Sequence, residues 1–415
     1  MARKMKDSGI EWIGEIPEGW EVVPVKRLCT MQAGKNLTSE QIAPEGTYPV
    51  YGGNGIRGFF SDYNCDGQFL TVGRQGALCG NVHKINGKVW ATEHAVITTP
   101  SSYTILDFLY YLLIGMDLNQ YVSSTAAQPG LAVGTLLNLK TCYPCSTLEQ
   151  TQISNYLNTK CSEIDVMLTK TRSSIEEYKK LKQAVITQAV TKGVRGKREM
   201  KDSGDDYIGQ IPAKWVLGKL RNVGDTQNGI SKSSEFFGKG FPFVSYSDVY
   251  KNYSLPFAVS GLVESTPEEQ ERYSVKEGDI FFTRTSETIE EVGFSCVCEK
   301  DIPNATFAGF LIRVRPFSDR LYTPYAKYYF RSTHLRFYLV KEMNLVTRAS
   351  LGQSLLKSMP VLLPPLEEQK EIANYLDAKC AEIDRLIAKK EQLVKELESY
   401  KKGLIYEVVT GKREV

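Results

Sequence analysis

The chain has 415 residues, of which 42% are hydrophobic and 24% are charged. This length is too great for one ordinary core, so it predicts two or more globular domains. Its formal charge of +3 excludes a basic surface over the whole molecule, so any surface for nucleic acid would be a local patch. The sequence lacks an apolar run of roughly 18 residues and an apolar signal-peptide core, which predicts no membrane partner. Nine cysteines without regular spacing are typical of a reducing compartment, so we expect a cytoplasmic protein.

The first predicted domain spans residues 1–147 and opens with the segment 5–20, which contains Ile16-Pro17 and Trp20. Short β-rich runs broken by Gly and Asn follow, and a helical stretch over 106–116 comes near the end. The β-rich runs cover residues 48–51, 69–72, 89–92 and 95–98. This pattern predicts a mixed α/β domain with a curved antiparallel sheet.

Two loops of this domain carry side chains that can read base edges in DNA. They are Gly52-Gly-Asn-Gly55, followed by Arg57, and Gly73-Arg-Gln-Gly76. Arg can form bidentate hydrogen bonds to guanine, and Asn or Gln can do so to adenine. Each residue alone could equally be a solvated loop residue, but together they favour a DNA-binding face. The candidates are Asn54, Arg57, Arg74 and Gln75.

A long helix is predicted next, over residues 148–192. No Pro or Gly interrupts residues 150–192, and apolar residues recur at steps of four and three. The seam consists of Leu157, Cys161, Ile164, Leu168, Ile175, Tyr178, Val185 and Ala189. Such heptad spacing indicates a helix with one apolar stripe, and some 40 residues at about 1.5 Å each give a rod of roughly 60 Å.

After this helix the sequence repeats its own opening. Met5-Lys-Asp-Ser-Gly9 recurs as Met200-Lys-Asp-Ser-Gly204, and Trp20 recurs as Trp215. Residues 150–157 recur as residues 369–376, ahead of a second helix and tail predicted over 367–415. Its seam is Leu376, Cys380, Ile383, Ile387, Val394, Leu397, Leu404 and Val408.

The repeat leaves the middle of each copy unmatched. Residues from about 21 to 145 share no evident run with those from about 216 to 362. We therefore expect an α+β protein with a pseudo-twofold internal repeat, in which two private domains are separated by two helices forming an antiparallel coiled coil. The alternative is that each helix packs on its own domain. A pseudo-twofold would also bring the C-terminal tail near the N-terminus.

The second private domain lies in residues 193–366, which begin with a linker. Its β-rich runs are 243–246, 279–283, 292–297 and 310–314, followed by a helical stretch over 324–340. A polar loop after the second run supplies Arg284, Thr285 and Ser286 as candidate base readers, and Arg348 is a further candidate.

Catalytic and metal motifs are not evident. Cys142, Cys145, Cys296 and Cys298 could suggest zinc together with the three histidines His83, His94 and His334, but the repeat lacks a second copy of the first cysteine pair, so we expect no metal site. No phosphate-binding loop or H-E-x-x-H motif is present, and we predict no catalytic residue. Trp20 and Trp215, each shortly after Ile-Pro, are predicted to be core anchors at the junction of domain and helix.

Three segments together resemble the specificity subunit of type I restriction-modification systems. Residues 5–20 look like the start of that family, Pro364-Pro-Leu-Glu-Glu-Gln-Lys-Glu-Ile372 looks like the beginning of its conserved helix, and Tyr406-Glu-Val-Val-Thr-Gly-Lys-Arg-Glu414 looks like its end. The resemblance covers nearly the whole chain. Pro144-Cys-Ser-Thr-Leu-Glu-Gln150 departs from the family's usual Pro-Pro-Leu-x-Glu-Gln, which leaves the local turn open.

The resemblance implies a non-catalytic subunit with two target-recognition domains that read the halves of a split, asymmetric site in double-stranded DNA. It implies that the conserved helices separate these domains and dock two adenine-N6 methyltransferase subunits, which a motor and nuclease (restriction) subunit can join. S-adenosylmethionine, ATP and magnesium would then belong to the partners. The shared blocks suggest docking through six aromatic residues, namely Trp12, Trp20, Tyr207, Trp215, Tyr156 and Tyr375.

A different class of function remains open on the residues alone. A structural adaptor could share the helices and bind protein through its loops, in which case it would show no salt-dependent affinity for DNA. A self-sufficient nuclease or methyltransferase would need motifs that the sequence does not show.

Overall fold

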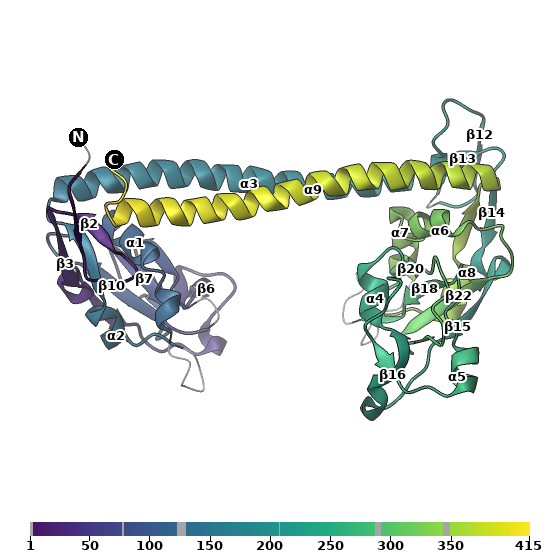
Figure 1. The fold of residues 1–415 in the computed structure, drawn as a ribbon, viewed down its shortest axis with the longest axis horizontal. Coiled ribbons are helices and arrows are strands. Elements are labelled where there is room, and N and C mark those ends of the chain that lie inside the picture. The colour runs from purple at the N-terminus through teal and green to yellow at the C-terminus, as the bar shows by residue number, and fades with distance from the viewer. Residues whose placement is uncertain (1–2, 77–78, 123–129, 207, 287–291, 343–348) are drawn as a thin grey trace. The chain divides into compact units, whose positions relative to one another are not determined.

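The computed structural model describes residues 3–76, 79–122, 130–206, 208–286, 292–342 and 349–415 (Figure 1). The chain divides into unit 1, Met1–Arg172 with Glu391–Val415, and unit 2, Ser173–Lys390. Each unit holds one private domain and part of both long helices, α3 (Thr147–Lys192) and α9 (Leu366–Val409). The two predicted helices therefore form, and α9 ends before the tail. No helix in the described part of the chain is long and apolar enough to cross a membrane.

Unit 1 is built on a four-stranded antiparallel sheet of order β4-β10-β7-β8, beside a three-stranded sheet of order β6-β5-β9. Strands β3 and β11 pair next to the start of α3, and β1 pairs with β2. The strands are β1 (Met5–Asp7), β2 (Glu15–Pro17), β3 (Trp20–Pro24), β4 (Cys29–Ala33), β5 (Tyr48–Gly52), β6 (Gly55–Phe60), β7 (Gln68–Gly73), β8 (Val82–Asn86), β9 (Trp90–Ala91), β10 (Ala95–Pro100) and β11 (Lys140–Pro144), and the shorter helices are α1 (Leu106–Gly115) and α2 (Val133–Asn138).

Unit 2 has a four-stranded antiparallel sheet of order β15-β22-β18-β20 and a three-stranded sheet of order β17-β16-β21. Three two-stranded pairs, β12-β13, β14-β24 and β19-β23, complete it. The strands are β12 (Met200–Asp202), β13 (Gln210–Pro212), β14 (Val216–Lys219), β15 (Gly224–Asn228), β16 (Phe237–Val244), β17 (Leu262–Val263), β18 (Ile280–Thr283), β19 (Thr285–Ser286), β20 (Ser295–Val297), β21 (Thr306–Phe307), β22 (Leu311–Pro316), β23 (Ala349–Ser350) and β24 (Pro360–Leu363). Its shorter helices are α4 (Tyr246–Lys251), α5 (Pro267–Arg272), α6 (Thr323–Tyr329), α7 (Thr333–Glu342) and α8 (Gln353–Ser358).

The two private domains share one topology although their sequences share no evident run. Both four-stranded sheets have the same strand order and direction, and a parallel pair, β5-β9 or β16-β21, lies beside each. After the first strand of each sheet comes a glycine, Gly34 or Gly229, whose missing Cβ would lie 2.2 Å from the carbonyl oxygen of Ala91 or Ala308. Any larger residue would clash with this carbonyl, so both domains have the same close contact between two backbone segments.

One predicted helix is broken. The stretch predicted as a single helix over 324–340 forms α6 and α7, separated by Phe330, Arg331 and Ser332. The guanidinium of Arg331 donates to the carbonyl oxygens of Val249, Ser295 and other residues of neighbouring segments, at 2.6 to 3.1 Å. These bonds fix the chain at the break. Sequence periodicity could not reveal them, because their acceptors lie elsewhere in the chain.

The long helices run antiparallel to each other within each unit. In unit 1, Lys401 Nζ lies 2.7 Å from Asp165 of α3; in unit 2, Lys182 Nζ lies 2.7 Å from Asp384 of α9. The repeat relates these two ion pairs, since Asp165 corresponds to Asp384 and Lys182 corresponds to Lys401. The predicted antiparallel pairing is therefore present in both units with one register.

The helices also pack on the private domains, so the two alternatives weighed for their seams both hold. The unit 1 core joins Leu157 of α3 and Leu404 of α9 to the domain residue Phe108. The unit 2 core joins Val190 of α3 and Leu376 of α9 in the same way to its own domain. Each domain is therefore seated on the beginning of one long helix and the end of the other.

A buried glutamine near the start of each long helix holds the private domain against that helix. Gln150 Oε1 accepts from the N–H of Ile105 at 2.8 Å, and its Nε2 donates to the carbonyls of Tyr103 and Pro144. Gln369 repeats the pattern in unit 2, accepting from the N–H of Tyr322 at 2.8 Å. Each glutamine thus ties the beginning of a domain helix, α1 or α6, to a long helix.

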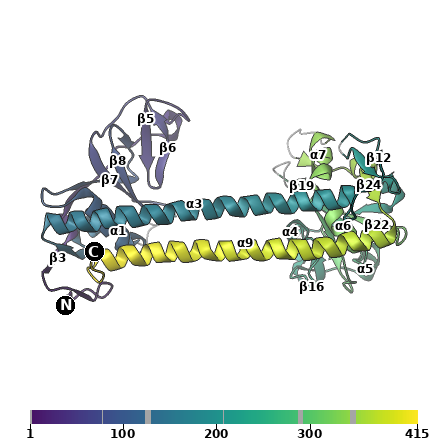
Figure 2. The same ribbon diagram turned by 90° about the horizontal axis from the view of Figure 1, so that it is seen from above.

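The two ends of the chain meet within unit 1, as the repeat predicts (Figure 2). Tyr406 Oη donates to the carbonyl oxygen of Trp12 at 2.9 Å, and Lys412 Nζ donates to that of Glu15 at 3.2 Å. The C-terminal tail therefore packs on the opening segment through Lys412. In unit 2 the last residue of α3, Lys192, donates to the carbonyl of Gln210 in the second copy of that segment.

Candidate nucleic-acid interface

In unit 1, the candidate residues gather at one edge of the four-stranded sheet. β7 ends at Gly73 opposite Ala95, where β10 begins, so Arg74 and His94 face each other just beyond the paired strands. The N–H of Arg74 donates to the carbonyl of His94 at 2.9 Å, and the carbonyl of Arg74 accepts from the N–H of Leu131 at 2.9 Å. Two backbone hydrogen bonds therefore hold Arg74 in place, and the residue is half-exposed.

The turn between β5 and β6 lies against the same edge. A Cβ on Gly53 would come within 2.8 Å of the carbonyl oxygen of Gln75, so only glycine allows this contact. Asn54, exposed at the turn, accepts a hydrogen bond from Asn81 Nδ2 at 2.7 Å. The exposed Arg57 follows on β6 with its side chain over Gly52. The four predicted residues of unit 1 are thus brought to one place.

In unit 2, Arg284 stands at the corresponding edge. It follows the last residue of β18, its N–H donates to the carbonyl of Phe310 at 2.8 Å, and its carbonyl accepts from the N–H of Leu351 at 2.8 Å. Thr285 and Ser286 continue from it as β19, in which Thr285 pairs with Ser350. Arg348 lies outside the described residues.

Arg74 and Arg284 are therefore structural counterparts. Each is the first residue after the third strand in sheet order, each donates to the residue before the neighbouring strand, and each accepts from a leucine that precedes a short helix, α2 or α8. A guanidinium recurs at one position in two domains whose cores share no evident run. Because backbone contacts can be kept by any residue, the recurrence of arginine indicates a function for its side chain.

Several residues at these edges escaped the sequence interpretation. In unit 1, Lys35 follows Gly34 with its N–H bonded to the carbonyl of Ala91, and Glu93 Oε1 lies 3.1 Å from His94 Nε2. Burial lowers the pKa of His83, so its ring beside Gly55 is neutral at pH 7. In unit 2, Phe310 is 64% exposed next to Arg284. His83 and His94 were considered only as possible zinc ligands, and no sequence signal placed any of these residues at the sheet edges, because their proximity depends on strand pairing.

Two of the proposed docking residues are corrected by their burial. The side chains of Trp20 and Trp215 are 1% and 0% exposed, so neither indole can contact a partner directly, and both anchor the core as their context also predicted. Tyr207 lies outside the described residues.

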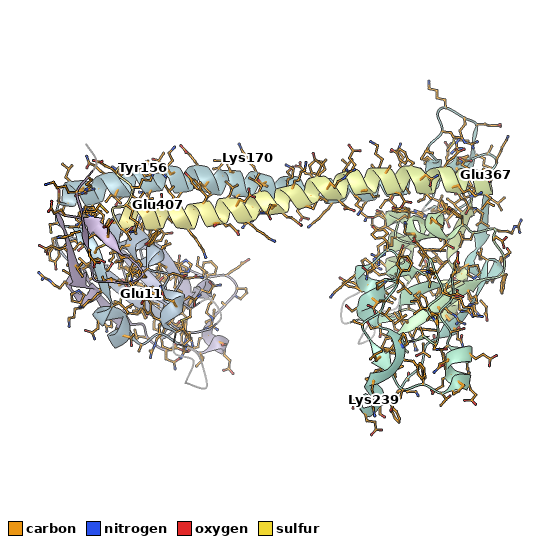
Figure 3. The ribbon with its side chains drawn as sticks, in the orientation of Figure 1. Glu11, Tyr156, Lys170, Lys239, Glu367 and Glu407 are labelled. Atoms are coloured by element: carbon orange, nitrogen blue, oxygen red, sulfur yellow. The ribbon has the colours of Figure 1, made fainter. Side chains whose placement is uncertain are left out.

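The remaining docking residues lie on accessible or half-accessible surfaces. Trp12 is half-buried, with its ring centroid 6.3 Å from that of Tyr406. Tyr156, labelled on α3 in Figure 3, packs partly on the unit 1 core, whereas Tyr375 is 39% exposed on α9. Docking through these three stays a prediction.

Both buried tryptophans belong to a repeated triad at the start of a long helix. Trp20 Nε1 donates to Glu149 at 3.0 Å, and the guanidinium of Arg3 binds the same carboxylate and lies over the indole, 5.6 Å from its centroid. In unit 2 the members are Trp215, Glu368 and Arg198, with the indole donating at 3.0 Å and the guanidinium 5.3 Å from the ring. Each triad joins the opening segment to the first turn of α3 or α9.

The triads differ in burial, and this predicts unequal effects on stability. The Glu368 side chain is 5% exposed against 29% for Glu149. Arg198→Met would leave a buried carboxylate without its cation, so we expect it to destabilise unit 2 by about 3 kcal/mol. The matched change Arg3→Met should cost unit 1 about 1 kcal/mol or less. Amide hydrogen exchange of the full chain measures both units at once, and equal loss of protection in the two variants would contradict this account.

Comparison with known proteins identifies the family. The family described as type I restriction modification DNA specificity domain matches residues 17–177 and 212–397, once in each half of the chain. The EcoprrI specificity subunit of Escherichia coli, a type I restriction enzyme subunit, is 45% identical over 121 residues, which cover 28% of this chain and 30% of that relative. The MjaVIII specificity subunit of Methanocaldococcus jannaschii is 25% identical over 418 residues, covering 96% of this chain and 93% of that one.

A solved chain from work on complex assembly and conformational transition of the type I restriction-modification system has a similar fold, with a TM-score of 0.71 at 16% identity, covering 96% of this chain and 99% of that one. The family match spans most of the chain and falls once around each private domain. The chain therefore belongs to the family of type I restriction-modification specificity subunits.

Proposed function

We propose that unit 1 and unit 2 each read one half of a split DNA site through the sheet edges that carry Arg74 and Arg284. The observation that carries this proposal is the recurrence of arginine at one structural position in two domains of different sequence. A guanidinium beyond the end of a strand is suited to guanine, whose O6 and N7 accept from it as a pair. Because the remaining edge residues differ between the units, the two half-sites would differ and the site would be asymmetric.

We further propose that the chain docks two copies of an adenine-N6 methyltransferase subunit and is not itself catalytic. The two opening segments support this, because they have the same internal hydrogen bonds. The N–H of Ser8 donates to the carbonyl of Gly14 at 2.9 Å, and that of Ser203 to the carbonyl of Gly209 at 3.0 Å. Two surfaces with one conformation suit two identical partners. S-adenosylmethionine, ATP and Mg²⁺ would be bound by these partners and by a restriction subunit that joins them.

The unbroken helices would set the length of the unread gap between the half-sites. α3 continues as one helix from Thr147 to Lys192, through the boundary between the units at residue 172, and α9 does so from Leu366 to Val409. The rise of an α-helix is fixed at about 1.5 Å per residue, so residue count determines spacing.

Mapping of methylated adenines in cells tests the proposal. With the methyltransferase subunit co-expressed, we expect a split motif that disappears when this chain is omitted. Exchange of residues 21–145 for the corresponding domain of another family member should alter one half-site and leave the other unchanged. A continuous motif, or methylation that does not depend on this chain, would contradict the proposal. A chain carrying a synonymous recoding of residues 21–145 controls for expression.

A further inference from the structure

The residue beside the shared arginine differs in chemistry between the two units. His94 and Phe310 are counterparts, because each accepts the backbone hydrogen bond of Arg74 or Arg284 and each immediately precedes β10 or β22. In unit 1 the preceding residue is Glu93, whose carboxylate contacts His94, so the position is polar. In unit 2 the preceding residue is Gly309, and Phe310 presents an apolar ring that is 64% exposed.

The backbone holds Phe310 in place even though its side chain is exposed. The N–H of Gly309 donates to the carbonyl of Ile230 at 2.8 Å, and the N–H of Leu311 donates to that of Ala308 at 2.9 Å. A Cβ on Gly309 would lie 2.3 Å from Ser231 Oγ, so the turn is closely packed. A large apolar side chain on a rigid turn loses little conformational freedom on binding, which favours a direct contact with a ligand.

Arg284 and Phe310 can reach neighbouring base pairs. Residues facing each other across an antiparallel pair have Cα atoms about 5 Å apart, which is comparable to the step of about 3.4 Å between bases along one strand. If Arg284 binds a guanine edge, the ring of Phe310 enters the same groove at the same or the adjacent step. The apolar group that a base presents in the major groove is the C5-methyl of thymine, and Phe is among the side chains that contact it.

A shared arginine cannot by itself make two half-sites different, whereas the residue beside it can. We propose that positions 94 and 310 determine specificity, and that Phe310 packs on the C5-methyl group of a thymine in the half-site of unit 2. The Glu93–His94 pair of unit 1 would require a hydrogen-bonding base edge at its corresponding position. This inference rests on the proposed function, since it requires that the sheet edge of unit 2 contacts DNA.

Uracil in place of thymine removes only this methyl group and so tests the contact directly. The complex of the full chain with its methyltransferase subunits is titrated onto duplexes that carry one thymine-to-uracil change at each position of the unit 2 half-site. We expect one position at which uracil weakens binding about fourfold, the size expected for one buried methyl group. With Phe310→Ala, thymine and uracil at that position should bind equally well.

A matched control and a second variant make the result decisive. Phe317 is 65% exposed just beyond the opposite end of β22, so Phe317→Ala should keep the uracil effect. Phe310→His should change the relative binding affinity for the bases at one position by roughly tenfold, which is the effect of one mismatched base pair. The preference at the other half-site should stay unchanged. A flat uracil scan together with lost binding in Arg284→Ala would overturn this inference and leave the proposed function standing. Unchanged binding in both Arg284→Ala and Phe310→Ala would remove the DNA contact itself.

Discussion

Arg284→Ala should reduce methylation of the intact site by between about fivefold and 150-fold. The loss corresponds to about 1–3 kcal/mol for one bidentate contact with a base. Two observations support this contact: two hydrogen bonds fix the backbone of Arg284, and the residue is half-exposed. Methylation at variant sites that differ only at the contacted base pair should fall much less, so the motif relaxes at one position.

The counterpart and a conservative change separate base reading from simple attraction to phosphate. Arg74→Ala should relax one position of the other half-site and leave the unit 2 half-site intact. Lysine keeps the charge but lacks the planar fork, so Arg284→Lys should remain defective if a base is read and should recover if a phosphate is bound.

Arg221 provides the control. It is exposed just before β15, at the opposite edge of the same sheet, and Arg221→Ala should leave the methylation rate unchanged. If Arg221→Ala and Arg284→Ala lowered methylation equally, loss of positive charge would explain both effects, and the base contact would be excluded.

The repeat and the helices could be predicted, and the two arginines could be singled out as candidates, because each left a signal that can be read from the sequence. Heptad spacing defined both seams, and a glycine- or threonine-flanked arginine after an apolar run marked Arg74 and Arg284. The shared topology of the private domains could not be predicted, because loops of different length change the offset between corresponding residues along the sequence. Gly34 and Gly229 are 195 residues apart, whereas Arg74 and Arg284 are 210 apart.

The second partner at each sheet edge was missed for the same reason. His94 and Phe310 meet the arginines only through antiparallel pairing, in which Ala95 lies opposite Gly73 and Leu311 opposite Thr283. A burial pattern tells which strands belong to a core, but strand order decides which loops adjoin. Asn54 and Gln75 were correctly grouped with Arg74, although the reason, the close approach of Gly53 to the Gln75 backbone, is a tertiary contact.

The seams also had two roles where one was expected. In unit 1, the seam residue Leu157 of α3 lies in one core with the seam residue Leu404 of α9 and with Phe108 of the private domain. One stripe thus serves both the partner helix and the domain, because a stripe about 100° wide exceeds the narrower seam of a two-helix contact. This double contact is what would make the helices effective spacers, since each domain is fixed to both of them.

Insertion of one heptad into both helices should lengthen the unread gap of the methylation motif by about three base pairs without altering either half-site. The insertions belong after Arg172 in α3 and after Lys390 in α9, at the residues where the chain passes from one unit to the other, so neither core is cut. Seven residues add about 10.5 Å, and base pairs are spaced at about 3.4 Å. Sequencing of methylated adenines gives the gap directly.

Because DNA is twisted, a longer gap also rotates one half-site about the DNA axis relative to the other. Three base pairs turn the far half-site by almost a third of a helical turn, whereas one heptad rotates a helix face by only about 20°. Methylation by the one-heptad variant should therefore be weak. Three heptads add about 31 Å, or about nine base pairs, which returns the half-site close to its original face after a turn of about 10.5 base pairs.

Activity should consequently fall with one heptad and recover with three, while the gap grows in both. An insertion in α3 alone is the control, because it shifts the register that pairs Lys182 with Asp384 and Lys401 with Asp165. A gap that keeps its native length in every variant that still methylates would show that the helices do not measure it, and a gap that grows without recovery at three heptads would show that the units are not held rigidly enough for DNA twist to matter.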